Sequence, residues 1–143
     1  MIRLVLDTNI LVSAILTPHG IPAKIITLAR EERVGLFFSH DTLKELGKVL
    51  HYPRLLAFMK KRGLALNTVE TFIKSIVGMS VITPGSLHIE AVKDDPTDNI
   101  FLVCAVEGEA DFIISGDHHL LDLKSFQGIK ILSPADFLKL IEK

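Results

Sequence analysis

The chain has very little cysteine and lacks the segments that mark secretion or membrane insertion. Its single cysteine, Cys104, excludes an intramolecular disulfide and, within one chain, a thiolate metal cluster. No run approaches the roughly 18 consecutive apolar residues that cross a membrane, and the N-terminus lacks the basic region, apolar core and cleavage site of a signal peptide. Internal repeats and low-complexity segments are also missing. We therefore expect a cytoplasmic protein whose 143 residues form a single domain, residues 1–143.

The net charge of −1 conceals an uneven distribution of charge along the chain. Residues 44–74 carry seven basic side chains against two acidic ones, whereas residues 90–122 carry nine acidic side chains against one lysine. Charge runs are usually solvated faces, but an acidic cluster beside a basic segment also suits a site that holds cations and binds a polyanion. We therefore predict that the basic segment contacts such a polyanion, through Lys44, Lys48 and Arg54, or forms a dimer flank.

Short apolar runs alternate with helical patterns along the whole chain. The runs predict strands at residues 2–6, 34–38, 81–83, 111–115 and 129–132, and Ser39 is the predicted N-cap of a helix over residues 40–50. Helices are also predicted near residues 10–16, 22–33, 54–62, 66–79, 100–106 and 135–141. Such alternation favours a parallel sheet with right-handed crossovers. We expect an α/β three-layer sandwich, with a central parallel sheet of about four to five strands flanked by helices.

Polar side chains follow two of these strands at the point where each strand ends. Asp7, Thr8 and Asn9 come directly after the first strand, and Ser115 and Asp117 come at the end of the fourth. In open α/β sheets, ligands bind in the crevice outside the carboxyl ends of the strands. Any one of the first three residues is, by itself, also a good helix N-cap. The prediction of a ligand site therefore depends on other acids that reach the same edge.

Glu45 and Asp98 are the acids that can reach this edge. Glu45 flanks the apolar stripe of the helix over residues 40–50, and Asp98 opens the buried helix over residues 100–106, where Asp95 is the predicted N-cap. An acid at a helix N-terminus stays ionised and available to a cation. Clustered carboxylates repel one another unless cations neutralise them, and their oxygens select Mg²⁺ or Mn²⁺. Such a site activates water and shields the charge of a scissile phosphate.

With these motifs the chain resembles the PIN domain family over essentially its whole length. The matching segments are Leu6-Asp7-Thr8-Asn9, Leu43-Lys44-Glu45-Leu46, Asp95-Pro96-Thr97-Asp98-Asn99 and Ser115-Gly116-Asp117 after Phe112-Ile113-Ile114. The resemblance implies a PIN-like fold and a ribonuclease activity that depends on one or two Mg²⁺ or Mn²⁺ ions. Bacterial and archaeal members of this kind resemble toxins of type II toxin–antitoxin pairs. That likeness implies a small antitoxin partner and a homodimer or higher homo-oligomer.

The resemblance also assigns roles to individual residues. Asp7, Glu45, Asp98 and Asp117 correspond to the acidic quartet, in which the three aspartates hold the metal ions and Glu45 adds a ligand or orients water. Thr8, Asn9 and Ser115 are expected to support the carboxylates or the attacking water. Asp95 and Asp122 are candidates for an outer shell of the same site. In-line attack of water on phosphorus would then leave a 3′-hydroxyl and a 5′-phosphate.

Two other functions compete with a nuclease. One is a catalytically silent PIN-like module that binds RNA or a protein partner, which loss of the quartet would favour, and here the quartet is intact. The other is a phosphoacceptor receiver domain, which the sequence disfavours because Asp7 has no acidic neighbour and no lysine follows Asp117. His118 and His119 are predicted to be surface or rim residues rather than metal ligands. Cys104 is predicted to fill space in the core.

Overall fold

The computed structural model describes residues 1–92 and 96–142, which fold around a six-stranded sheet. The strand order is β3-β2-β1-β4-β6-β5, and every neighbouring pair is parallel except β5 and β6. The strands are β1 (Ile2–Leu6), β2 (Val34–Ser39), β3 (Val81–Thr83), β4 (Phe112–Ile114), β5 (Ser125–Phe126) and β6 (Ile129–Leu132). The helices are α1 (Thr8–Leu16), α2 (Ile21–Arg30), α3 (His40–Leu50), α4 (Pro53–Lys61), α5 (Leu66–Gly78), α6 (Asn99–Glu107), α7 (His118–Leu121) and α8 (Pro134–Ile141), and a short 3₁₀ helix, η1 (Pro96–Asp98), precedes α6. The predicted α/β fold is confirmed.

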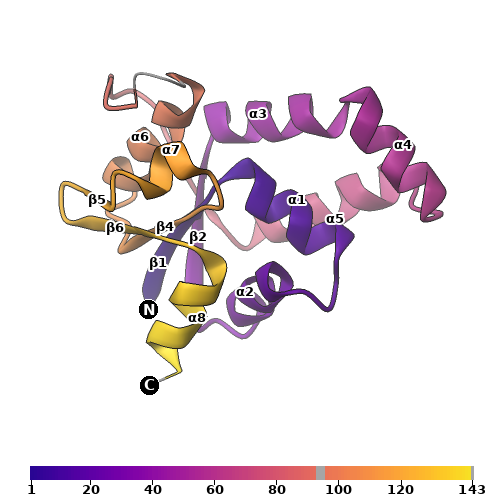
Figure 1. Ribbon diagram of the computed structural model, residues 1–143, viewed down its shortest axis with the longest axis horizontal. Coiled ribbons are helices and arrows are strands. Elements are labelled where there is room, and N and C mark those ends of the chain that lie inside the picture. Colours follow the sequence, from indigo (N-terminus) through magenta and orange to yellow (C-terminus); the bar gives the residue numbers. More distant parts are fainter. Residues whose placement is uncertain (93–95, 143) are drawn as a thin grey trace.

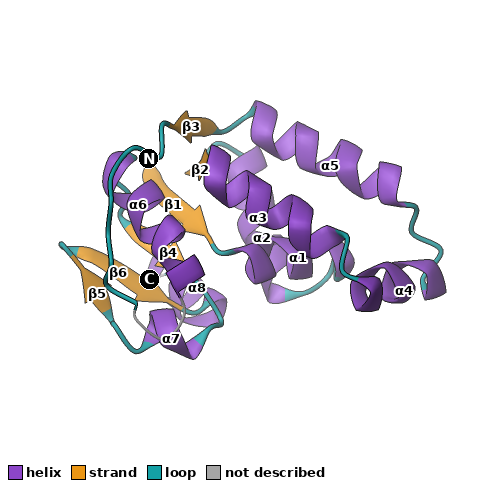
Figure 2. Ribbon diagram, turned by 90° about the horizontal axis from the view of Figure 1, so that it is seen from above, coloured by secondary structure: helices purple, strands orange, loops and turns teal. Residues whose placement is uncertain are grey.

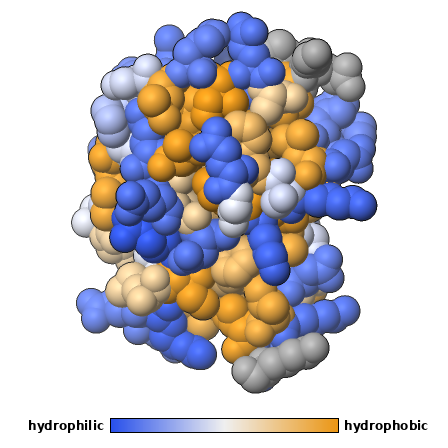
Figure 3. Space-filling model, turned by 90° about the vertical axis from the view of Figure 1, so that its left-hand side faces the viewer, coloured by the Kyte–Doolittle hydropathy of each residue, from blue (hydrophilic) through white to orange (hydrophobic). Residues whose placement is uncertain are grey.

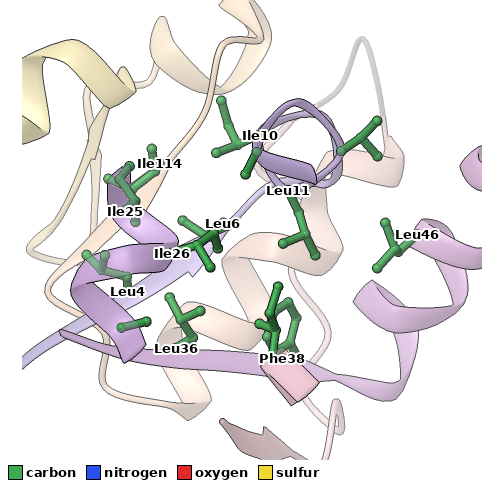
Figure 4. Packing of buried hydrophobic residues seen from close by; sticks show 14 of the residues in the cluster. Leu4, Leu6, Ile10, Leu11, Ile25, Ile26, Leu36, Phe38, Leu46 and Ile114 are labelled. Atoms are coloured by element: carbon green, nitrogen blue, oxygen red, sulfur yellow. The ribbon is translucent and has the colours of Figure 1, made fainter. Parts of the chain in front are cut away.

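Helices cover both faces of the sheet, because successive residues of each strand point to opposite sides. Leu4 and Leu6 of β1 belong to one buried cluster, whereas Val5 between them belongs to another. The first cluster packs the sheet against α1, α2, α3 and α8, and Figure 4 shows its side chains facing one another. The second packs the opposite face against α6 and α7. The result is the expected three-layer sandwich, from which α3, α4 and α5 extend to one side (Figures 1 and 2).

The sheet has one strand more than the four to five that the sequence predicted. β5 is only two residues long and pairs antiparallel with β6 at the edge of the sheet. The two strands are joined by Gln127 and Gly128, both with positive φ, of 50° and 83°. This is the backbone of a tight two-residue hairpin, and the Gln-Gly pair is a weak sequence signal for it. The face that includes this edge carries polar and apolar side chains side by side (Figure 3).

Most of the predicted element boundaries hold because local capping fixes them. The Ser39 hydroxyl accepts the Thr42 N–H at 3.1 Å, and the Thr42 hydroxyl accepts the Ser39 N–H at 2.9 Å. This reciprocal pair is a capping box, and it confirms Ser39 as the N-cap of α3. The second helix ends earlier than predicted, at Arg30, and the chain then turns through Glu32 with a φ of 61°.

The helix predicted over residues 100–106 is α6, and its side chains from Phe101 to Ala105 are buried, as expected. It begins differently from the prediction, since η1 precedes it and Asp98 makes no side-chain cap bond to it. The predicted N-cap, Asp95, lies outside the described residues. Cys104 is fully buried in this helix, as predicted, and burial raises the pKa of its thiol to about 11.

Within the described residues, no single helix is both long and apolar enough to cross a membrane. α1 and α2 meet that criterion only when taken together, and the chain bends by 92° between them.

We predict opposite effects on stability for two glycine-to-alanine substitutions. A Cβ at Gly108, which ends α6, would lie 2.8 Å from Cδ2 of the buried Phe37 ring, so Gly108→Ala should lower the free energy of unfolding by about 1–3 kcal/mol. At Gly47, inside α3, a Cβ would meet no heavy atom of the described residues within 4 Å. Gly47→Ala should therefore raise that free energy by about 0.5–1 kcal/mol. Urea unfolding followed by circular dichroism measures both, and equal effects of the two changes would contradict the packing described here.

Candidate metal centre

A pocket of about 360 Å³ at the carboxyl edge of the sheet brings the four predicted acids together. Residues from the start of α1, from α3 and from the start of α6 form its walls, and Asp117 contributes from the end of β4. The lining residues are Asp7, Thr8, Asn9, Glu45, Lys48, Val49, Tyr52, Thr97, Asp98, Phe101 and Asp117. Side chains that are up to 110 positions apart in the sequence thus meet at one edge, as the positions of the strand ends predicted.

Asp7 sits where β1 passes into α1, and its backbone and side chain are both fixed. Its N–H donates to the Ile114 carbonyl at 3.0 Å, so the pairing of β1 with β4 continues up to the carboxylate. Its Oδ1 accepts the Ile10 N–H at 2.9 Å and caps α1. Only 4% of the residue is exposed. Asp7 is therefore both the helix cap and a wall of the pocket, two readings that the sequence treated as alternatives.

Ser115 links Asp7 to Asp117. Its fully buried hydroxyl donates to Oδ2 of Asp7 and accepts the Asp117 N–H at 2.9 Å. The Asp117 carboxylate in turn accepts the His119 N–H at 2.8 Å and caps α7. One hydroxyl thus holds the end of β1 against the end of β4, the supporting position that was predicted for Ser115.

Burial is the main influence on the ionisation of Asp7, and it raises the pKa of this carboxyl above its usual value. The hydrogen bonds from Ser115 and from the Ile10 N–H oppose that shift, while the charge of Asp117 adds to it. The net effect is that the ionised form of Asp7 is disfavoured in the folded chain. A cation in the pocket would reverse this penalty, because it neutralises the carboxylates at close range.

His119 lies inside the acidic cluster, where the sequence had placed only a rim residue. Asp98, Asp117 and His119 each offer one ligand atom, and these atoms all lie within 4.8 Å of one another. His118, by contrast, has a side chain that is 76% exposed, as predicted for both histidines. Two adjacent histidines are indistinguishable in sequence, and the direction in which α7 starts decides which of them faces the pocket.

Asp98 is held in place by its neighbour, a residue that the sequence analysis included only as part of a motif. The buried Asn99 side chain accepts the N–H groups of Ala91 and Val92 at 3.0 and 2.8 Å and donates to the Val92 carbonyl at 3.1 Å. These three bonds tie the start of α6 to the segment that leads toward it. Asn99 is therefore a positioning residue for the buried Asp98.

The remaining predicted residues divide into those that line the pocket and those that do not. Glu45 is half-buried and lines the pocket from α3 together with the exposed Lys48. Lys44 is exposed on the same helix but is not among the lining residues, and neither is the exposed Asp122. Arg54 lines a neighbouring groove of about 300 Å³, which shares Asn9, Val49 and Tyr52 with the pocket.

The residues of the pocket fit a divalent metal ion. Their carboxylate oxygens are the ligands that Mg²⁺ and Mn²⁺ prefer, and Lys48 is the one basic side chain among the described lining residues. The Thr8 hydroxyl also lines the pocket, is buried, and has no hydrogen-bond partner among the described residues. Buried polar groups rarely stay unpaired, so this oxygen is suited to a metal-bound water or a metal ion.

Comparison with known proteins agrees with this geometry. The family model of the PIN domain matches residues 3–119. The chain is also 31% identical, over 150 aligned residues, to an uncharacterized protein of Methanocaldococcus jannaschii, and the alignment covers 99% of this chain and 93% of the other.

We predict that Asp7→Asn stabilises the metal-free protein as the pH rises. Below the unfolded-state pKa of about 3.9 the carboxyl is neutral in both states. Above it the unfolded chain ionises first, because the folded-state pKa is raised, so the free energy of unfolding falls until the pH passes the folded-state pKa. The asparagine variant lacks this loss. Its melting temperature, measured in EDTA, should exceed that of the wild type by a margin that grows from pH 4 upward and then levels off, whereas a margin that shrinks with pH would contradict the buried, unneutralised state of Asp7.

Proposed function

Because this chain belongs to the PIN domain family, whose members are generally nucleases, we propose that it is a Mg²⁺- or Mn²⁺-dependent endoribonuclease. The observation that carries the proposal is the meeting of Asp7, Glu45, Asp98 and Asp117 in one pocket. A silent binding module has no use for buried carboxylates that destabilise one another. Their presence supports hydrolysis over binding alone.

Each residue of the pocket has a distinct task in this proposal. Asp7, Asp98 and Asp117 would hold the metal, and Glu45 faces them from α3, where it can add a ligand or orient the attacking water. Ser115 keeps the Asp7 carboxylate in one orientation through its hydrogen bond. When bound, a divalent ion lowers the pKa of water and shields the charge that develops on the phosphate. Attack on phosphorus breaks the bond to the 3′-oxygen, which leaves a 3′-hydroxyl and a 5′-phosphate.

The rim of the pocket supports a polyanionic substrate. Lys48 offers a cation next to the acidic wall, and Tyr52 is 45% exposed where the pocket opens into the neighbouring groove. Arg54 lies along that groove. A strand that enters the pocket with its scissile phosphate would therefore meet a tyrosine ring and basic side chains on one side. Aromatic and basic side chains together are typical of single-strand binding.

The wider biological role follows from the resemblance of the sequence and stays a prediction. We propose that the protein acts in the cytoplasm as the toxin of a type II toxin–antitoxin pair, bound by a small antitoxin and assembled as a homodimer. Co-expression with the product of an adjacent small reading frame tests the role. Growth arrest by the nuclease alone, relieved by that product, is the expected result, and growth unaffected by the active nuclease would contradict it.

The direct test of the activity is cleavage of RNA by purified protein with Mn²⁺ or Mg²⁺. We expect cleavage that EDTA abolishes and that Asp98→Asn reduces by about 100-fold or more, since outer-shell changes alone already cost 10–100-fold at metal sites. Asp136→Asn, at an exposed position of α8, is the matched control and should keep full activity. Cleavage unchanged by Asp98→Asn would exclude the proposed site, and a failure to cleave any RNA would favour the binding module.

Substrate binding should depend on Lys48 more than on Lys44. Both are exposed lysines of α3, but only Lys48 lines the pocket. In EDTA, where no cleavage occurs, Lys48→Ala should weaken binding of a labelled single-stranded RNA and reduce the slope of log K against log salt by about 0.7, the value for one phosphate contact. Fluorescence anisotropy at several salt concentrations measures both quantities. A larger effect of Lys44→Ala would show that the RNA follows another path across α3.

A further inference from the structure

We propose that His119 supplies an imidazole nitrogen to the metal centre and thereby makes this site prefer Mn²⁺ over Mg²⁺. The inference rests on the proposed metal dependence of the pocket, although not on the chemistry that the metal serves. It concerns a residue outside the acidic quartet, and it changes the expected ligand set from oxygen alone to oxygen and nitrogen.

The distances in the cluster fit ligands of one ion. The ligand atoms of Asp98, Asp117 and His119 lie within 4.8 Å of one another, and the Nδ1 of His119 is 3.6 Å from Oδ1 of Asp117. Around an octahedral ion with bonds of about 2.1 Å, neighbouring ligand atoms lie about 3 Å apart and opposite ones about 4.2 Å apart. Small movements of side chains therefore suffice to bring all three onto one ion.

Local structure fixes His119, and not His118, toward the cluster. The N–H of His119 donates to the Asp117 carboxylate, which ties the backbone of the histidine to the ligand that it would accompany. The His119 side chain is 31% exposed, against 76% for His118. The His118 ring packs beside that of His119, with ring centroids 4.2 Å apart. Only one of the two imidazoles thus lies at the acidic site.

The Thr8 hydroxyl is a second, independent sign that a ligand belongs here. Thr8 is only 8% exposed, lines the same pocket as Asp98 and Asp117, and its oxygen has no hydrogen-bond partner among the described residues. It comes from the other side of Asp7 and has no connection with α7. A hydrated ion in the pocket would give this oxygen the partner that a buried hydroxyl needs.

The identity of the ligands then determines the preferred ion. Mg²⁺ takes oxygen ligands and keeps much of its water, whereas imidazole favours first-row transition ions. Mn²⁺ is the one of these that is also suited to carboxylates. A set of two aspartates and one histidine therefore raises affinity for Mn²⁺ with little gain for Mg²⁺.

Electron paramagnetic resonance of the Mn²⁺-loaded protein tests the proposal without any assay of cleavage. Electron spin echo envelope modulation should detect an imidazole ¹⁴N coupled to Mn²⁺ in the wild type and in the control His118→Ala, but not in His119→Ala. Competition titrations should show that His119→Ala lowers the ratio of Mn²⁺ to Mg²⁺ affinity by about 10-fold or more. His119→Asp, which restores an oxygen ligand, should bind Mg²⁺ more tightly than His119→Ala does. A thermal melt in EDTA verifies that each variant is folded.

The outcomes separate this proposal from the nuclease itself. Nitrogen coupling that persists in His119→Ala, or wild-type protein that binds Mn²⁺ without such coupling, would overturn the role of His119 even if RNA is cleaved. Nitrogen coupling in a protein that cleaves no RNA would support His119 and contradict the ribonuclease. A wild-type protein that binds no Mn²⁺ at all would overturn both.

Discussion

The hydroxyl of Ser115 is the contact on which the site depends, because it joins the two strands that carry acidic residues. It donates to the Asp7 carboxylate at the end of β1 and accepts the N–H of Asp117 after β4. The register that pairs Leu6 with Ile114 brings these ends level. Since Ser115 is fully buried, neither bond competes with water. The spacing between the two aspartates is therefore set by strand pairing and by one side chain, and not by mobile loops.

This arrangement concentrates negative charge where the chain can least neutralise it by itself. Asp7 and Asp98 are buried, Asp117 is close enough to raise the pKa of Asp7, and the basic side chain of the pocket, Lys48, is exposed. Buried carboxylates with so little compensation destabilise a fold. A protein gains nothing from this arrangement in structural terms. The unfavourable charge is explained by function, because a divalent ion converts the same repulsion into affinity.

The sequence predicted the sheet edge well because the relevant signals are local. An apolar run that ends in Asp7, a capping residue such as Ser39 and a helix that is apolar all round each reveal themselves within a few residues. Two features could not be predicted in this way. β5 exists only because β6 offers it a partner, and the role of His119 depends on the direction in which a single turn, α7, leaves the strand. Both are decided by tertiary contacts, and a two-residue strand or one of two adjacent histidines carries no periodic pattern.

The two walls of the pocket are held by different parts of the fold. The aspartates belong to the layer of strands and to the start of α6, whereas Glu45 and Lys48 belong to α3, which extends away from the sheet (Figure 2). They lie three residues apart, on one side of that helix, and the capping box of Ser39 and Thr42 fixes where the helix begins. Because β2 lies beside β1, this cap also sets the position of α3 against the metal ligands. The wall that meets the substrate is thus anchored to the same sheet as the metal ligands, but through a helix cap, so its residues can adapt to a substrate without disturbing the ligands on the strands.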